Sequence, residues 1–206
     1  ISINHPDEPL TYSGYVWGSL FDFYLQGFWI ACAFIIGLGG LWRERATGMA
    51  TFTLSLPVRR KDLVVIRALM ATAEAFLIAL VPCLLIPMFS SATGYQYPFE
   101  QSVAFAVLLT FGGLVFVGLS ILLSSVFDGE YTAFVFGMCV IGTAFFAFKA
   151  RSVHRWSIFD VMSGARHIDA TTHLINSVPW MGLTASVLLS MLLVIASVHI
   201  LYRRDF

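Results

Sequence analysis

The polar side chains that could perform chemistry in this sequence are few, and none of them forms a catalytic pattern. The metalloprotease pattern H-E-x-x-H and the nucleophile pattern G-x-S-x-G are both absent. The phosphate-binding pattern G-x-x-x-x-G-K-S/T is absent too, because neither lysine, Lys61 or Lys149, follows a glycine. We therefore predict no catalytic residues and no cofactor on this chain, and any ATPase that serves it must be another chain.

A group of possible metal ligands lies in the segment 150–179. His154, His167 and His173 share this segment with Asp160 and Asp169, and imidazole and carboxylate groups are common metal ligands. Their spacing matches no compact zinc pattern. We therefore interpret them as solvated loop residues and predict no metal site.

Three further polar residues lie inside apolar stretches. Glu74 is near the middle of one stretch, where a carboxylate is costly unless it is paired, protonated or hydrated. Asp22 and Gln26 are four residues apart in another stretch. All three are candidates for a polar cavity or a substrate path. The alternative is a structural hydrogen bond between helices. For Glu74 the two interpretations have equal support, and for Asp22 we prefer the structural one.

The composition around these residues is that of a membrane protein. The chain is 58% hydrophobic and 12% charged, with a mean hydropathy of +0.83, whereas a soluble domain is about 25% charged. A helix needs roughly 20 apolar residues to cross the hydrocarbon core of a bilayer. Five stretches qualify, and they predict an all-α polytopic membrane helix bundle that forms one transmembrane domain over residues 1–206: 16–41, 63–89, 103–127, 131–148 and 180–202.

The basic residues predict the orientation of these spans, since cytoplasmic loops carry an excess of Lys and Arg. One side holds the loop 42–62 and the C-terminal tail, and we predict that this side is cytoplasmic because it carries Arg43, Arg45, Arg59, Arg60, Lys61, Arg203 and Arg204. The segment 150–179 is then extracytoplasmic. Trp156, Phe159 and Met162 recur there every three residues, which predicts a short helix at the membrane surface.

The cytoplasmic loop 42–62 has the most specific pattern. Gly48 is placed to end a helix, and Met49, Phe52 and Leu56 then share one face of a short second helix. Pro57 interrupts that helix, and a basic cluster follows at the membrane edge. This helix rests on anionic lipid in one interpretation, and docks into a groove on a soluble partner in the other.

Three features of this chain resemble one transporter family. Glu44 and Gly48 precede the run LSLPVRRKDL of residues 54–63, and the chain ends in YRRDF. These residues are similar to the coupling loop and the C-terminus of the permease subunits of type-2 ATP-binding-cassette (ABC) exporters. The resemblance implies six spans with both termini in the cytoplasm. Because five spans are visible, we expect one further span before residue 1.

The resemblance also implies a function and partners. The chain would form the substrate path of an exporter in the plasma or inner membrane of a bacterium or archaeon. It would pair with a second permease subunit, identical or different, and with a separate ATPase that binds ATP and Mg. No nucleic acid is expected, since the net charge is zero. The residues that would couple to the ATPase are Glu44, Arg45, Gly48, Met49, Phe52, Leu56, Pro57, Arg59, Arg60 and Lys61.

Two functions of other classes remain as alternatives. A non-catalytic membrane scaffold or assembly factor would share the hydropathy of this chain but would move no solute. An intramembrane enzyme would need several polar residues at one depth, and the spans offer no nucleophile–base pair. The substrate is not encoded in any pattern that we identify.

Overall fold

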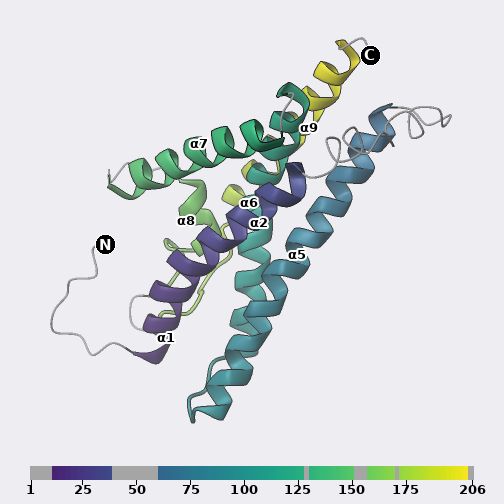
Figure 1. Cartoon of the computed structure of the whole chain (residues 1–206). Coiled ribbons are helices and arrows are strands. Elements are labelled where there is room, and N and C mark those ends of the chain that lie inside the picture. Colours follow the sequence, from purple (N-terminus) through teal and green to yellow (C-terminus); the bar gives the residue numbers. More distant parts are fainter. Residues whose placement is uncertain (1–10, 39–59, 128–129, 151–156, 170–171, 204–206) are drawn as a thin grey trace.

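The apolar stretches of the sequence form long helices in the computed structural model, which describes residues 11–38, 60–127, 130–150, 157–169 and 172–203 (Figure 1). Among these residues, four helices are long and apolar enough to cross a membrane: Tyr12–Leu38, Asp62–Ala92, Phe99–Val126 and Trp180–Ile200. A shorter apolar helix, Thr132–Ala147, accompanies them. The predicted all-α polytopic membrane bundle is confirmed.

The boundaries of the helices are as follows. The first long helix consists of a short α-helix, a π-helical segment and a second α-helix, which are α1 (Tyr12–Tyr15), η1 (Val16–Leu25) and α2 (Gln26–Leu38). The remaining elements are α5 (Arg60–Ala92), α6 (Phe99–Val126), α7 (Glu130–Ala150), α8 (Ile158–Ser163) and α9 (Trp180–Arg203). Helices α5 and α6 extend beyond the predicted spans because their polar ends continue the helix past the apolar stretch that hydropathy detects.

Helix α6 is the centre of the bundle. Of its most apolar stretch, 78% is buried inside the protein, compared with 22% for α5 and 17% for α9. It packs against α2, α5, α8 and α9. Phe105, Leu109 and Ile121 on α6 are almost fully buried. The core therefore lies around α6, and the other helices surround it.

Small residues allow the helices to approach α6 closely. A Cβ atom on Gly118 would lie 3.0 Å from the backbone oxygen of Ser190, so the backbones of α6 and α9 touch. Ser186 and Ser190, four residues apart, are buried on α9, and small residues at this spacing let helix backbones approach closely. The same spacing recurs on the buried side of α5 at Ala71, Ala75, Ala79 and Cys83.

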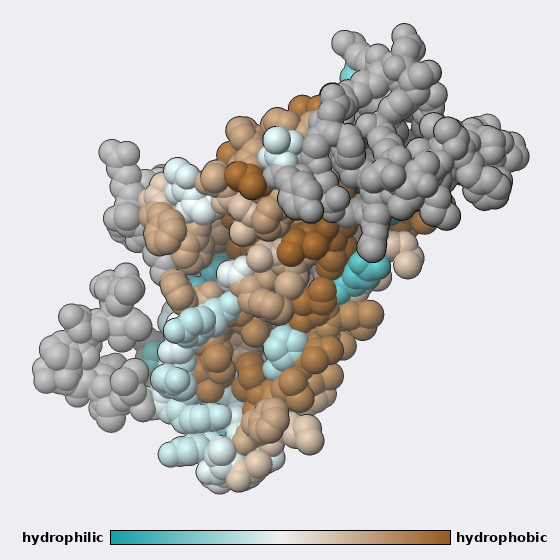
Figure 2. Space-filling model, in the orientation of Figure 1, coloured by the Kyte–Doolittle hydropathy of each residue, from teal (hydrophilic) through white to brown (hydrophobic). Residues whose placement is uncertain are grey.

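The outward faces of α5 and α9 are apolar. Figure 2 shows a broad hydrophobic surface, with hydrophilic residues gathered toward the lower left of the molecule. Such a surface is incompatible with water and suits lipid. Its exposed side chains include Val65, Ile66, Leu69, Met70, Leu77, Val81 and Met88 on α5, and Leu188, Met191, Leu192 and Ile195 on α9.

The start of α5 and the end of α9 lie at the same end of the bundle. In Figure 1, the start of α5 and the end of α9 lie at the upper right, whereas the connection between α5 and α6 lies at the opposite end. Arg60 opens α5 and Arg203 closes α9. This arrangement is compatible with the predicted cytoplasmic side, which stays a prediction.

Helix α8 occupies the segment in which a short helix was predicted, but it packs into the bundle. Phe159 and Met162 are buried, while Trp156 lies outside the described residues. A Cβ atom on Gly112 of α6 would lie 3.2 Å from the backbone of Met162. Gly164 then ends α8 in the left-handed region, with φ of 66°. Where α8 lies relative to the lipid surface stays a prediction.

Candidate functional site

Most of the predicted coupling loop lies outside the described residues. Its members Glu44, Arg45, Gly48, Met49, Phe52, Leu56, Pro57 and Arg59 belong to that group. Arg60 and Lys61 form the first turn of α5. The helices on either side of the loop, α2 and α5, pack against each other.

Gln26 lies at the junction of η1 and α2 and faces the interior. Its side chain is only 1% exposed. The Nε2 atom donates a hydrogen bond of 2.8 Å to the backbone oxygen of Phe159 on α8. This bond accounts for the burial of a polar amide and ties α2 to α8.

Asp22 lies in η1, a ten-residue π-helical segment that the sequence did not predict. Such segments are rare and are frequent at functional sites. Two contacts hold η1 in place. The ring of Phe21 stacks on Phe105 of α6 with centroids 4.1 Å apart. The Trp17 Nε1 atom donates to the backbone oxygen of Ser163 at 3.0 Å. Asp22 itself is half-buried.

Glu74 lies on the outward face of α5, among apolar side chains. Met70 and Leu77, one turn away on either side, are more than half exposed. The next residue, Ala75, faces inward, and its backbone oxygen accepts a 2.8 Å hydrogen bond from Trp29 Nε1. No hydrogen bond or ion pair joins Glu74 to another residue in the part of the chain that the structure describes. The structure therefore does not bring Glu74 and Gln26 together.

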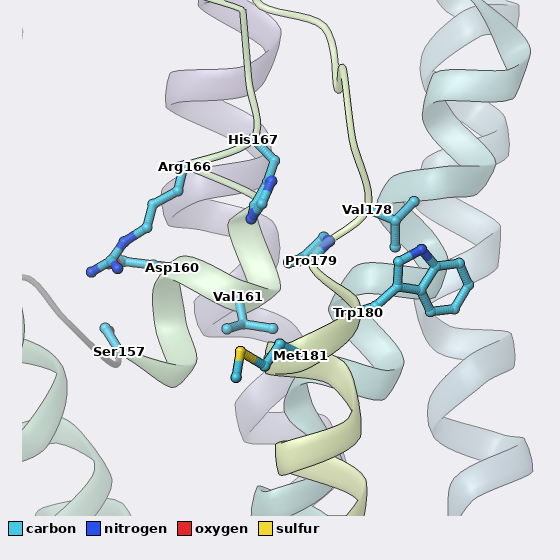
Figure 3. A pocket seen from close by; sticks show the side chains of 10 residues that line it. Ser157, Asp160, Val161, Arg166, His167, Val178, Pro179, Trp180 and Met181 are labelled. Carbon is cyan, nitrogen blue, oxygen red and sulfur yellow. The ribbon is translucent and has the colours of Figure 1, made fainter.

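Of the histidines and carboxylates in segment 150–179, Asp160 and His167 line a pocket with mainly apolar walls. Within the described residues, no three His, Cys, Asp or Glu side chains lie close enough to hold a metal ion. Asp160 and Arg166 instead form an ion pair of 3.4 Å. Figure 3 shows both beside His167 at a cavity of about 440 Å³. The sequence showed these charges but not their proximity, since six residues and a turn separate them.

The comparison with protein families identifies the class of this bundle. The family described as "ABC-2 family transporter protein" matches residues 16–151, which is more than half of the chain. The chain belongs to the ABC-2 transporter family. No curated protein and no solved structure matches it. The predicted resemblance to an ABC permease is thereby confirmed.

Membership in the ABC-2 family gives the described helices a general role. The matched range contains η1, α2, α5, α6 and α7, together with the loop 42–62. Proteins of this family are membrane permeases that work with an ABC ATPase, which is in general carried by a partner. The ABC-2 chain is accordingly a membrane component for transport.

Proposed function

We propose that this ABC-2 chain is the permease subunit of an exporter, and that a separate ATPase drives it through the loop 44–61. The family match, which includes this loop, carries the proposal. The tight packing of α2 and α5 against α6 supports it, because movement of the loop would be transmitted to the central helix.

The docking surface that we propose is the apolar face of Met49, Phe52 and Leu56. An amphipathic helix binds a groove through apolar residues at such spacing. The basic residues Arg59 and Arg60 would then lie at the cytoplasmic membrane surface. Export and the pairing with a second permease subunit belong to the same proposal and rest on the resemblance to type-2 exporters.

Replacement of the docking face tests this proposal. In the full-length protein, the double variant F52E/L56E should co-purify with at least about tenfold less ATPase than the wild type does. The reason is that two buried apolar contacts are worth roughly 3–6 kcal/mol. The measurement is quantitative mass spectrometry after affinity purification in mild detergent. Phe99→Glu, on an exposed side chain at the start of α6, introduces a carboxylate far from the loop and should leave assembly unchanged. Undiminished ATPase in the double variant would contradict the docking site.

A further inference from the structure

The pocket beside α8 has the position of a lipid headgroup site. It lies between α8, the segment that follows it and the first turn of α9. The membrane-crossing stretch of α9 begins at Trp180, which itself lines the pocket. If α9 enters the bilayer at Trp180, the pocket lies at the level of the headgroup layer. Its volume of about 440 Å³ falls in the range of ligand sites, about 300–1,000 Å³.

The two charges in the pocket form a loose ion pair. Arg166 Nη2 and Asp160 Oδ2 are 3.4 Å apart, which is longer than the roughly 2.7–2.9 Å of a tight charge-assisted bond. The side chains are 43% and 38% exposed, respectively. Both charged groups thus remain accessible from the cavity, and Figure 3 shows them on the same side of it.

The backbone around these charges is well supported. The Ala165 amide donates to the backbone oxygen of Asp160, and the His167 amide donates to that of Gly164. The His167 ring is held by a 2.8 Å hydrogen bond between Nδ1 and Ser177 Oγ. A Cβ atom on Gly182 would lie 2.6 Å from Val161, so α8 rests directly on α9. The pocket is thus formed before any ligand arrives.

We propose that this pocket binds the headgroup of phosphatidylethanolamine. The Arg166 guanidinium pairs with the phosphate, and the Asp160 carboxylate accepts hydrogen bonds from the primary ammonium. The acyl chains continue along the apolar wall of α9, where Trp180 and Met181 are 71% and 72% exposed. The glycerol of phosphatidylglycerol offers Asp160 no positive charge to pair with, and a quaternary ammonium offers it no N–H donor.

Lipid retention by the wild-type complex tests the proposal without any substitution. The full-length protein, with its co-purifying partners, is incubated with vesicles of phosphatidylethanolamine, phosphatidylglycerol or phosphatidylcholine that carry identical acyl chains. Native mass spectrometry then counts the lipids that stay bound. Phosphatidylethanolamine should be retained at least about tenfold more than either competitor, since each charge-assisted bond contributes about that factor. Equal retention of the three lipids overturns the proposal.

Two variants separate the roles of the charges. R166Q should lower the retention of all three phospholipids, because it removes the partner of the phosphate. R166K keeps a positive charge and should therefore keep most of the retention. D160N should lose the preference for phosphatidylethanolamine over phosphatidylglycerol. Glu100→Gln removes an exposed carboxylate at the start of α6, outside the pocket, and should change neither. Soluble phosphoethanolamine that binds as tightly as the lipid would overturn the assignment to a membrane lipid.

Discussion

At the scale of single residues, the side chain of Tyr97 is buried although it carries a polar hydroxyl group. It lies in the connection between α5 and α6, is only 6% exposed and stacks on Phe21. Its hydroxyl has no hydrogen-bond partner among the described residues. Burial, and to a lesser extent the nearby Cys83 and Tyr12, raises the pKa of this hydroxyl above its ordinary value of about 10.

Tyr97→Phe should stabilise the protein and alter its response to alkali. The variant removes a buried donor without a partner, so its free energy of unfolding should rise by about 1–3 kcal/mol at pH 8. In the wild type, the unfolded chain loses the Tyr97 proton near pH 10 while the folded chain keeps it. Stability therefore falls as the pH rises above about 10. Thermal unfolding in detergent between pH 8 and 11 should show a shallower alkaline loss in the variant; parallel curves would refute the assignment.

At the scale of the helices, glycine positions decide how closely α2 and α7 reach their neighbours. A Cβ atom on Gly113 of α6 would lie 2.1 Å from the Trp29 ring, and one on Gly137 of α7 would lie 2.0 Å from the Phe34 ring. Trp29 cannot move easily, because its indole is buried and bonded to the backbone of Ala75. Large aromatic residues on α2 thus fill the space that the glycines leave.

Gly113→Ala should destabilise the bundle by about 1–3 kcal/mol, because the added methyl group overlaps a ring that is held in place. Gly142→Ala on α7 is the matched control, since no atom other than those of its chain neighbours and its own helix backbone lies within 4 Å of the position that its new methyl group would take. The control should be neutral or stabilising by up to about 1 kcal/mol, the gain in helix propensity. Unfolding midpoints of the two variants in detergent measure the difference, and equal effects would rule out a tight contact at Gly113.

At the scale of the whole molecule, one carboxylate does not fit the lipid-facing surface. Helices α5 and α9 present apolar faces, and the exposed Glu74 interrupts the face of α5. A charge in contact with lipid at this depth costs about 2.5–3.5 kcal/mol or more. Glu74 is tolerated there if it meets water in a substrate path, pairs with a polar partner or is protonated. We favour the path, which keeps the role predicted for this residue.

Cysteine labelling tests this position without knowledge of the substrate. With Cys32, Cys83 and Cys139 replaced by Ala, the variant E74C should react with a water-soluble maleimide in the assembled complex, because a path contains water. Leu192→Cys, on the exposed apolar face of α9, should react much more slowly, because lipid excludes the reagent. Equal rates at the two positions would place Glu74 outside a water-filled path.

The sequence by itself determined the class of the protein and the places of its helices. Apolar length and scarcity of charge are local properties, so hydropathy was sufficient to predict a polytopic helical bundle. The three-residue spacing of apolar residues in turn predicted a short helix between residues 150 and 179. The resemblance at the loop 42–62 and the C-terminus indicated the family that the match to residues 16–151 then showed.

Only the tertiary structure decided which side of each helix faces inward. In a soluble helix, the apolar stripe reveals the buried face, but helices in lipid are apolar all round, and the pattern carries little directional information. Hence the central place of α6, the inward Gln26, the outward Glu74 and the meeting of Asp160 with Arg166 were not predictable. These features depend on close packing between distant segments, which small residues permit but hydropathy does not encode.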